Sequence, residues 1–283
     1  MTEIAVGVSN AGPAGERAVR WAAQQAAARG ARLRLVHVVD RAIEATGDAE
    51  LLLAAQTGAA DALQDAQAMA LAEAPGLDVV TELEQGRPEE VFERISKSVE
   101  LLVVATDWHG GRRPSRRGVH SLRIAASSHA PVAVIPDVDL SIRHGVVVGV
   151  DGSPEGARAL DFAAREAERI GESLIAVHAW DIAVIAGGEY GYGVAMVGTE
   201  ELSHAAEEVL DEALEPIVQA HPNLEIMRRV ITGDPVTALA DESMDATLLV
   251  VGSHGRGPLA RFLLGSVSHG VLAHLEAPTI VVR

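Results

Sequence analysis

The chain consists of two similar halves, and this internal duplication constrains its fold more than any other feature. Residues 4–9 read IAVGVS and residues 146–151 read VVVGVD, each an apolar, β-branched run that ends in a turn. An alanine-rich segment with helical periodicity follows each run, at residues 14–28 and 155–168. The repeat distance is roughly 140 residues, far above the period of roughly 20–50 residues in solenoid repeats. The sequence therefore predicts two copies of one domain.

Further apolar runs recur in the same order in both halves. Three more pairs lie at residues 33–39 and 173–180, 99–106 and 246–253, and 130–135 and 277–282. Apolar runs without polar alternation, separated by helical segments, are typical of a parallel sheet covered by helices on both faces. We therefore predict an α/β protein with two doubly wound domains, residues 1–140 and 141–283, joined by the polar segment 136–144.

Charge and composition exclude several classes of function. The 283 residues carry a formal net charge of −17, and nucleic-acid binding requires clustered cations. Cysteine is absent, which excludes disulfides and thiolate catalysis. Residues 1–12 lack the basic start and apolar run of a secretory signal, and no apolar run approaches the ~20 residues that span a bilayer. We expect a cytoplasmic protein that binds neither nucleic acid nor membranes.

The strongest chemical signal follows the fourth apolar run of the second half. Residues 252–266 contain the pattern G-x2-G-x9-G-S, whose defined positions are Gly252, Gly255, Gly265 and Ser266. Glycine allows a ligand to approach the backbone closely, and a helix N-terminus offers unpaired N–H groups to an anion. Ser268 adds a further hydroxyl group. The spacing predicts a phosphate-binding loop at the carboxyl ends of the strands, where Asp151 also lies.

This pattern, together with the duplication, resembles that of the tandem universal stress proteins that bind ATP. The resemblance covers both halves and implies two Rossmann-like domains of the adenine nucleotide alpha hydrolase-like type, each with a five-stranded parallel sheet. It also implies that Asp151 contacts the nucleoside and that the backbone near Ala179 reads the adenine. The implied ribose and phosphate contacts are Val251, Gly252, Gly255, Gly265, Ser266, Val267 and Ser268. We add the neighbouring cation, Arg256, to the ATP-binding set.

The first half departs from this pattern where the phosphates would bind. Alignment of the halves places Ala105 and Trp108 at the first two glycine positions, Val119 at the hydroxyl position and Ser9 opposite Asp151. We therefore expect one ATP per chain, with Mg²⁺, in the second half. Four arginines in the same loop of the first half could instead hold an anion or meet an acidic partner. They are Arg112, Arg113, Arg116 and Arg117.

Absent motifs limit the catalytic hypotheses. The chain has no G-x4-G-K-S/T sequence, and Lys97 is its only lysine, which excludes a P-loop ATPase. We assign no catalytic residue and no metal-binding residue. The resemblance implies a stress-response regulator in which ATP acts as a conformational switch for an unknown protein partner. A slow ATPase or phosphotransferase at the same site, and a scaffold that binds no nucleotide, remain alternatives.

Two expectations concern assembly. In single-domain relatives the last strand mediates dimerisation, so residues 132–135 and 279–282 are expected to pair the two domains as a pseudo-dimer within the chain. A homodimer remains possible. The segment 182–198 is rich in glycine and contains both tyrosines of the chain, and we predict a mobile loop near the nucleotide or at an interface.

Overall fold

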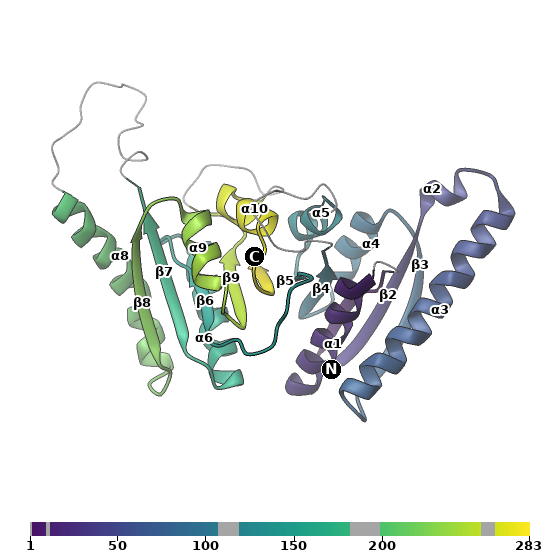
Figure 1. Ribbon diagram of the computed structural model, residues 1–283, viewed down its shortest axis with the longest axis horizontal. Helices are drawn as coiled ribbons and strands as arrows, with labels where there is room; N and C mark the ends of the chain where they lie inside the picture. The colour runs from purple at the N-terminus through teal and green to yellow at the C-terminus, as the bar shows by residue number, and fades with distance from the viewer. Residues whose placement is uncertain (1, 10–11, 107–118, 182–198, 256–263) are drawn as a thin grey trace, which may run out of the picture. The chain divides into compact units, whose positions relative to one another are not determined.

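The computed structural model divides the polypeptide into two units, residues 1–138 and 139–283 (Figure 1). It describes residues 2–9, 12–106, 119–181, 199–255 and 264–283. Each unit is an α/β domain with a parallel sheet, so the predicted fold class is confirmed. The segment 182–198 and the four arginines of the first loop lie outside the described residues.

The first unit contains five strands and five helices among the described residues. In chain order they are β1 (Glu3–Gly7), α1 (Gly12–Arg29), β2 (Arg32–Asp40), α2 (Arg41–Glu44), α3 (Ala49–Glu73), β3 (Val79–Gly86), α4 (Pro88–Ile95), β4 (Leu101–Ala105), α5 (Val119–Ser127) and β5 (Val132–Ile135). The strand order is β3-β2-β1-β4-β5, and every pair is parallel. The order reverses at β1, so β1 and β4 flank a topological switch point.

The second unit repeats this order. Its described elements are β6 (Val146–Gly149), α6 (Pro154–Ile170), β7 (Leu174–Trp180), α8 (Thr199–Ala220), β8 (Ile226–Thr232), α9 (Pro235–Ser243), β9 (Leu248–Gly252), α10 (Ser266–Ala273) and β10 (Thr279–Val282). The strands run β8-β7-β6-β9-β10, all parallel. The switch point therefore lies between β6 and β9, as it lies between β1 and β4 in the first unit.

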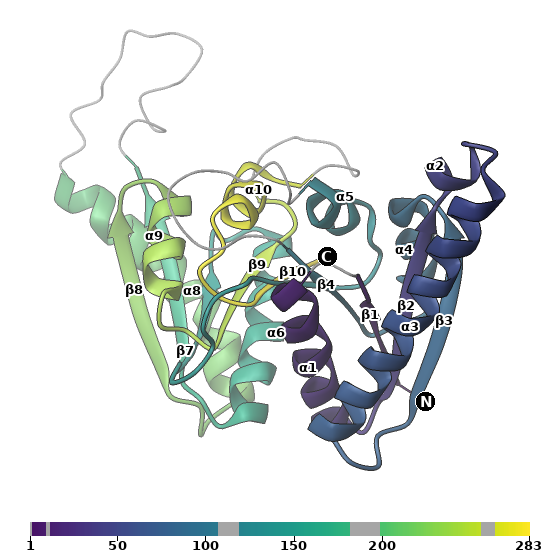
Figure 2. The same cartoon turned by 45° about the vertical axis from the view of Figure 1, so that its right-hand side comes forward.

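Helices cover both faces of each sheet (Figure 2). In the first unit α1 packs against α3 on one face, and α4 packs against α5 on the other. In the second unit α6 packs against α8, and α9 against α10. The central strands are accordingly buried on both sides, which explains why β4 (LLVVA) and β9 (LLVVG) are apolar without alternation.

Alanine stripes let α1 and α6 approach their sheets closely. In α1 the stripe is Ala18, Ala22 and Ala26, and in α6 it is Ala159, Ala163 and Ala167; all six side chains are fully buried. A spacing of four residues places them on one helix face. Pro154 begins α6 at a position where a missing N–H costs nothing, as the sequence predicts.

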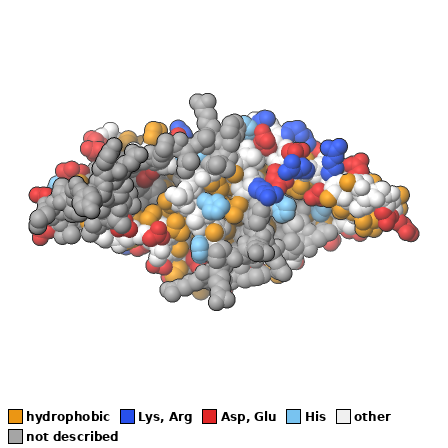
Figure 3. Space-filling view, turned by 90° about the horizontal axis from the view of Figure 1, so that it is seen from above, with side chains coloured by type: hydrophobic (Ala, Val, Ile, Leu, Met, Phe, Trp, Pro, Cys, Tyr) orange, Lys and Arg blue, Asp and Glu red, His pale blue; other side chains and the backbone are white. Residues whose placement is uncertain are grey.

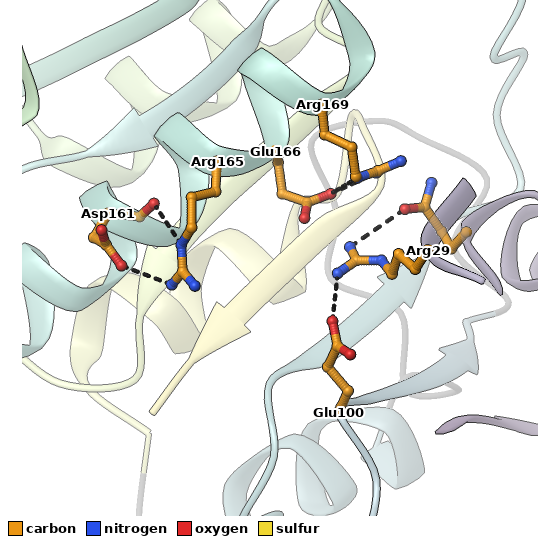
Figure 4. Close-up of polar contacts among 7 residues, drawn as sticks. Arg29, Glu100, Asp161, Arg165, Glu166 and Arg169 are labelled. Carbon is orange, nitrogen blue, oxygen red and sulfur yellow. Dashed lines mark hydrogen bonds and ion pairs between the residues drawn. The ribbon is translucent and has the colours of Figure 1, made fainter. Parts of the chain in front are cut away.

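Ion pairs lie at the ends of these helices (Figure 4). At the end of α1, Arg29 Nη1 lies 2.9 Å from Glu100 Oε1. In α6, Arg169 Nη2 lies 2.6 Å from Glu166 Oε2, and the Glu166 side chain is only 6% exposed. A carboxylate buried to this degree requires a cation partner. The Arg169 pair therefore allows α6 to bury Glu166 beside its alanine stripe.

Candidate functional site

A cavity of about 380 Å³ opens at the carboxyl ends of β6, β7 and β9, at the switch point of the second unit. All the predicted binding residues that the structure describes line it: Asp151, Ala179, Val251, Gly252, Gly255, Gly265, Ser266, Val267 and Ser268. Arg256 lies outside the described residues. The fold thus brings the glycine-rich loop, the turn after β6 and the end of β7 to one place.

Asp151 is fixed by the turn that leads from β6 into α6. Its Oδ1 accepts hydrogen bonds from the backbone N–H of Ser153 at 2.9 Å and from the Ser153 hydroxyl at 2.6 Å. Ser153 Oγ in turn accepts from the N–H of Gly156 at 3.0 Å and so caps α6. The turn DGSP therefore forms a chain of hydrogen bonds from Gly156 through Ser153 to Asp151, which holds the carboxylate in the cavity wall.

Two glycines make room for this carboxylate. A Cβ added at Gly156 would lie 2.5 Å from Asp151 Oδ1, and one added at Gly255 would collide with Asp151 Oδ2. Gly156 also lines the cavity, and the sequence reading missed it. A signal was present, because Gly15 occupies the same position in the first unit.

The two ends of the glycine-rich loop are joined by hydrogen bonds. The N–H of Gly265 donates to the carbonyl oxygen of Ser253 at 2.8 Å. The Ser268 hydroxyl, which is 2% exposed, lies 3.1 Å from that same carbonyl oxygen and 3.0 Å from the carbonyl oxygen of Gly265. The Ser268 hydroxyl therefore donates its proton to the backbone, and in this structure it joins the two ends of the loop.

Helix α10 begins at the edge of the cavity without a side-chain cap. Gly265 is the N-cap residue, and Ser266 is the first, exposed residue of the helix. The first N–H groups of a helix have no partner within it, and they carry the positive end of its dipole. The end of α10 can therefore accept an anionic group.

The charge of the lining is low. Among the described lining residues Asp151 is the only formally charged side chain, and no lysine or arginine is present. Figure 3 shows the molecule from above the view of Figure 1, with hydrophobic side chains in orange, histidines in pale blue, and lysines and arginines in blue. A bound polyanion would therefore rely on N–H groups, hydroxyls and an added cation.

An apolar wall forms part of the lining. Val150, Val177, Pro235 and Leu239 line it, the last two from α9. A cavity with an apolar wall and a few placed polar groups is typical of a site for a small organic ligand. Sequence reasoning missed the contribution of α9, although the repeat pairs Pro235 with Pro88.

The first unit has a cavity of about 420 Å³ at the equivalent place. Its lining includes Ser9, Ala105 and Phe92, which correspond to Asp151, Gly252 and Leu239. The departures predicted from the sequence at Ser9 and Ala105 thus lie in the cavity wall. Trp108 and the side chain of Val119 lie outside the described residues.

The described residues contain neither a membrane-spanning helix nor a metal-binding cluster. In this part of the chain no helix combines the length and apolar character needed to cross a bilayer. The same residues contain no group of three or more histidine, aspartate or glutamate side chains placed to hold a metal ion.

Comparison with known proteins agrees with the duplication. A model of the universal stress protein family matches residues 1–136 and again residues 143–283. A universal stress protein of Mycolicibacterium smegmatis is 33% identical over 290 residues, which cover 99% of this chain and 96% of the relative. One from Mycobacterium tuberculosis is 34% identical over 293 residues, with coverage of 99% and 96%.

The fold is also found among solved structures. The crystal structure of a universal stress protein from Archaeoglobus fulgidus superposes with a TM-score of 0.71 at 18% identity, covering 99% of this chain and 96% of that one. At this identity the likeness concerns the fold.

Proposed function

Because the chain belongs to the universal stress protein family, we propose that its second unit binds one ATP molecule in the cavity at the ends of β6, β7 and β9. The observation that carries the proposal is the meeting of the G-x2-G-x9-G-S loop with the uncapped start of α10 in one cavity. We place the adenine near Ala179 and the apolar wall, and the phosphates near Gly265 and Ser266.

Magnesium is part of this proposal. The phosphates of ATP carry several negative charges, and the described lining contains a carboxylate and no cationic side chain. The N–H groups at the start of α10 offset only part of this charge. We therefore propose that ATP binds as its Mg²⁺ complex, with Arg256 as a further cation.

We propose that the bound nucleotide regulates the affinity of the protein for a partner. Such a switch requires that the ATP-bound and ATP-free forms of the second unit differ in affinity for that partner. No covalent step is needed. In this proposal the protein is a stress-response regulator and not an enzyme.

A slow ATPase is the second candidate, and one residue favours it. His254 lines the cavity, and its Nδ1 lies 3.2 Å from Ser253 Oγ. Its Nε2 is buried without a hydrogen-bond partner among the described residues. In the tautomer whose Nδ1–H donates to Ser253 Oγ, Nε2 is an acceptor that can take a proton from an attacking water, so hydrolysis would be lost in His254→Gln.

The first test is the nucleotide content of the purified protein. We expect about one ATP per chain when protein prepared without added nucleotide is denatured and the released nucleotides are separated by chromatography. Gly265→Glu should lose the ATP, because its carboxylate would lie at the start of α10, where the anion is proposed to bind. The added Cβ would also lie only 3.3 Å from His254 Cα.

A control variant separates this effect from added charge. Asn223→Glu places the same carboxylate on an exposed turn between α8 and β8, and it should keep the ATP. Two ATP per chain would show that the first unit also binds. Recovery of mainly ADP would favour the ATPase. If no nucleotide is recovered and calorimetry shows no binding of Mg-ATP, the scaffold alternative replaces our proposal.

A further inference from the structure

The two carboxylate oxygens of Asp151 lie against two different segments of the second unit. Oδ1 faces Gly156 in the first turn of α6, and Oδ2 faces Gly255 in the glycine-rich loop. Oδ1 is also bonded to Ser153, so the carboxylate cannot turn away without losing those bonds. The carboxylate therefore fills the space between the helix start and the loop.

Gly255 has no other reason in the described structure to be glycine. Its φ angle is not among the positive ones, so its backbone conformation is open to alanine. An added Cβ would meet the Oδ2 and Cγ atoms of Asp151, the latter at 3.6 Å, and no other described atom within 4 Å. The steric demand at this position comes from the side chain of Asp151.

The first unit is a natural comparison for this pair. Where the second unit has Asp151 the first has the shorter Ser9, and where the second has Gly255 the first has Trp108. Gly15, the counterpart of Gly156, is retained, and a Cβ there would approach the backbone oxygen of Ser9 to 3.2 Å. The loop glycine is thus absent where the carboxylate is absent, while the helix glycine is retained and faces the backbone oxygen and hydroxyl of Ser9 in the first unit.

We infer that Asp151 is a positioning residue, whose carboxylate acts as a spacer that sets how closely the loop at Gly255 approaches α6, and that Gly255 is glycine to admit this carboxylate. The inference rests on the proposed ATP site for its functional consequence. The carboxylate positions Gly255, which lines the same cavity as Gly265 and Ser266 beside the proposed phosphate position.

The test is Gly255→Ala in three backgrounds: the natural protein, Asp151→Asn and Asp151→Ser. Asparagine has the size of aspartate without its charge, and serine reproduces the first unit. We expect Gly255→Ala to weaken ATP binding about tenfold in the natural and asparagine backgrounds, because an overpacked side chain displaces its neighbours. In the serine background the same change should weaken binding less than about threefold, because the obstacle is gone.

Calorimetry of Mg-ATP binding and the thermal unfolding temperature are both measured for all six proteins. An equal loss of affinity in the serine background would overturn the inference, because Gly255 would then be needed by the ligand itself. If the natural protein binds no ATP, the proposed function fails; if only the serine background binds none, the ligand itself needs Asp151. In both cases the unfolding temperature still tests the spacer. Gly255→Ala should then lower the unfolding temperature in the natural and asparagine backgrounds and not in the serine background, and a uniform effect would refute the spacer.

Discussion

At the scale of the residue, two equivalent histidines show how one position can differ between the units. His178 Nδ1 lies 2.7 Å from the carbonyl oxygen of Val150, whereas His37 Nδ1 is buried without a partner among the described residues. Burial lowers the pKa of His37 below its ordinary value of 6.5. Near pH 6.5 His37 therefore binds a proton more readily in the unfolded chain than in the folded unit.

This difference predicts a pH dependence of stability. Because the pKa of His37 is lowered in the folded state, the neutral imidazole contributes to the free energy of unfolding. This contribution is complete above pH 6.5 and is lost as the pH falls through the folded pKa of His37. We expect His37→Asn to reduce the fall in unfolding temperature between about pH 7.5 and about pH 5. An unchanged slope would contradict this role.

The matched control is His178→Asn. At neutral pH it should lower the free energy of unfolding by about 1–3 kcal/mol, because the buried carbonyl oxygen of Val150 loses its partner. Chemical denaturation across the same pH series measures both variants.

At the scale of the element, the paired helices that border each cavity are joined differently. In the second unit α10 touches α9 so closely that a Cβ added at Gly270 would lie 2.6 Å from Val236 Cγ2. The equivalent residues of the first unit are Arg123 and Glu89, whose Nη1 and Oε1 atoms lie 3.3 Å apart. Close packing in one unit is thus replaced by an ion pair in the other.

Gly270→Ala should therefore destabilise the second unit. Valine is stiff at χ1, so α10 has to move, and we expect a loss of about 1–3 kcal/mol in the free energy of unfolding. In a Val236→Ala background the same change should instead stabilise by up to about 1 kcal/mol, because alanine favours the helix. Denaturant titration of the four proteins gives both values, and stabilisation by Gly270→Ala alone would disprove the close packing.

At the scale of the whole molecule, the proposed site belongs to one unit. Every described residue that lines the cavity lies between Gly149 and Ser268. The division at residues 138 and 139 leaves this set intact. The second unit also has its own sheet and helices on both faces, which is what an independently folding domain requires.

We therefore expect the fragment 139–283 to bind Mg-ATP with a dissociation constant within about threefold of that of the full chain. The fragment 1–138 is the control and should show no binding. Circular dichroism establishes that each fragment is folded. A folded 139–283 fragment that fails to bind would show that the first unit contributes to the site.

The fold class and the location of the candidate loop can be predicted from the sequence alone. Both follow from local patterns, because apolar runs such as LLVVA and LLVVG, alanine stripes and glycine spacing are read within one segment at a time. The repeat added the pairing of segments between the halves and so indicated which half departs from the pattern, at Ser9 and Ala105.

The contacts of the individual groups depend on the tertiary structure. It placed the carboxylate of Asp151 between Gly156 and Gly255, and it turned the Ser268 hydroxyl to the carbonyl oxygen of Ser253. The family resemblance implies that both side chains also contact the ligand, and both line the cavity. Such contacts join segments far apart in the chain, and their distances depend on how strands and helices pack, which no local periodicity encodes.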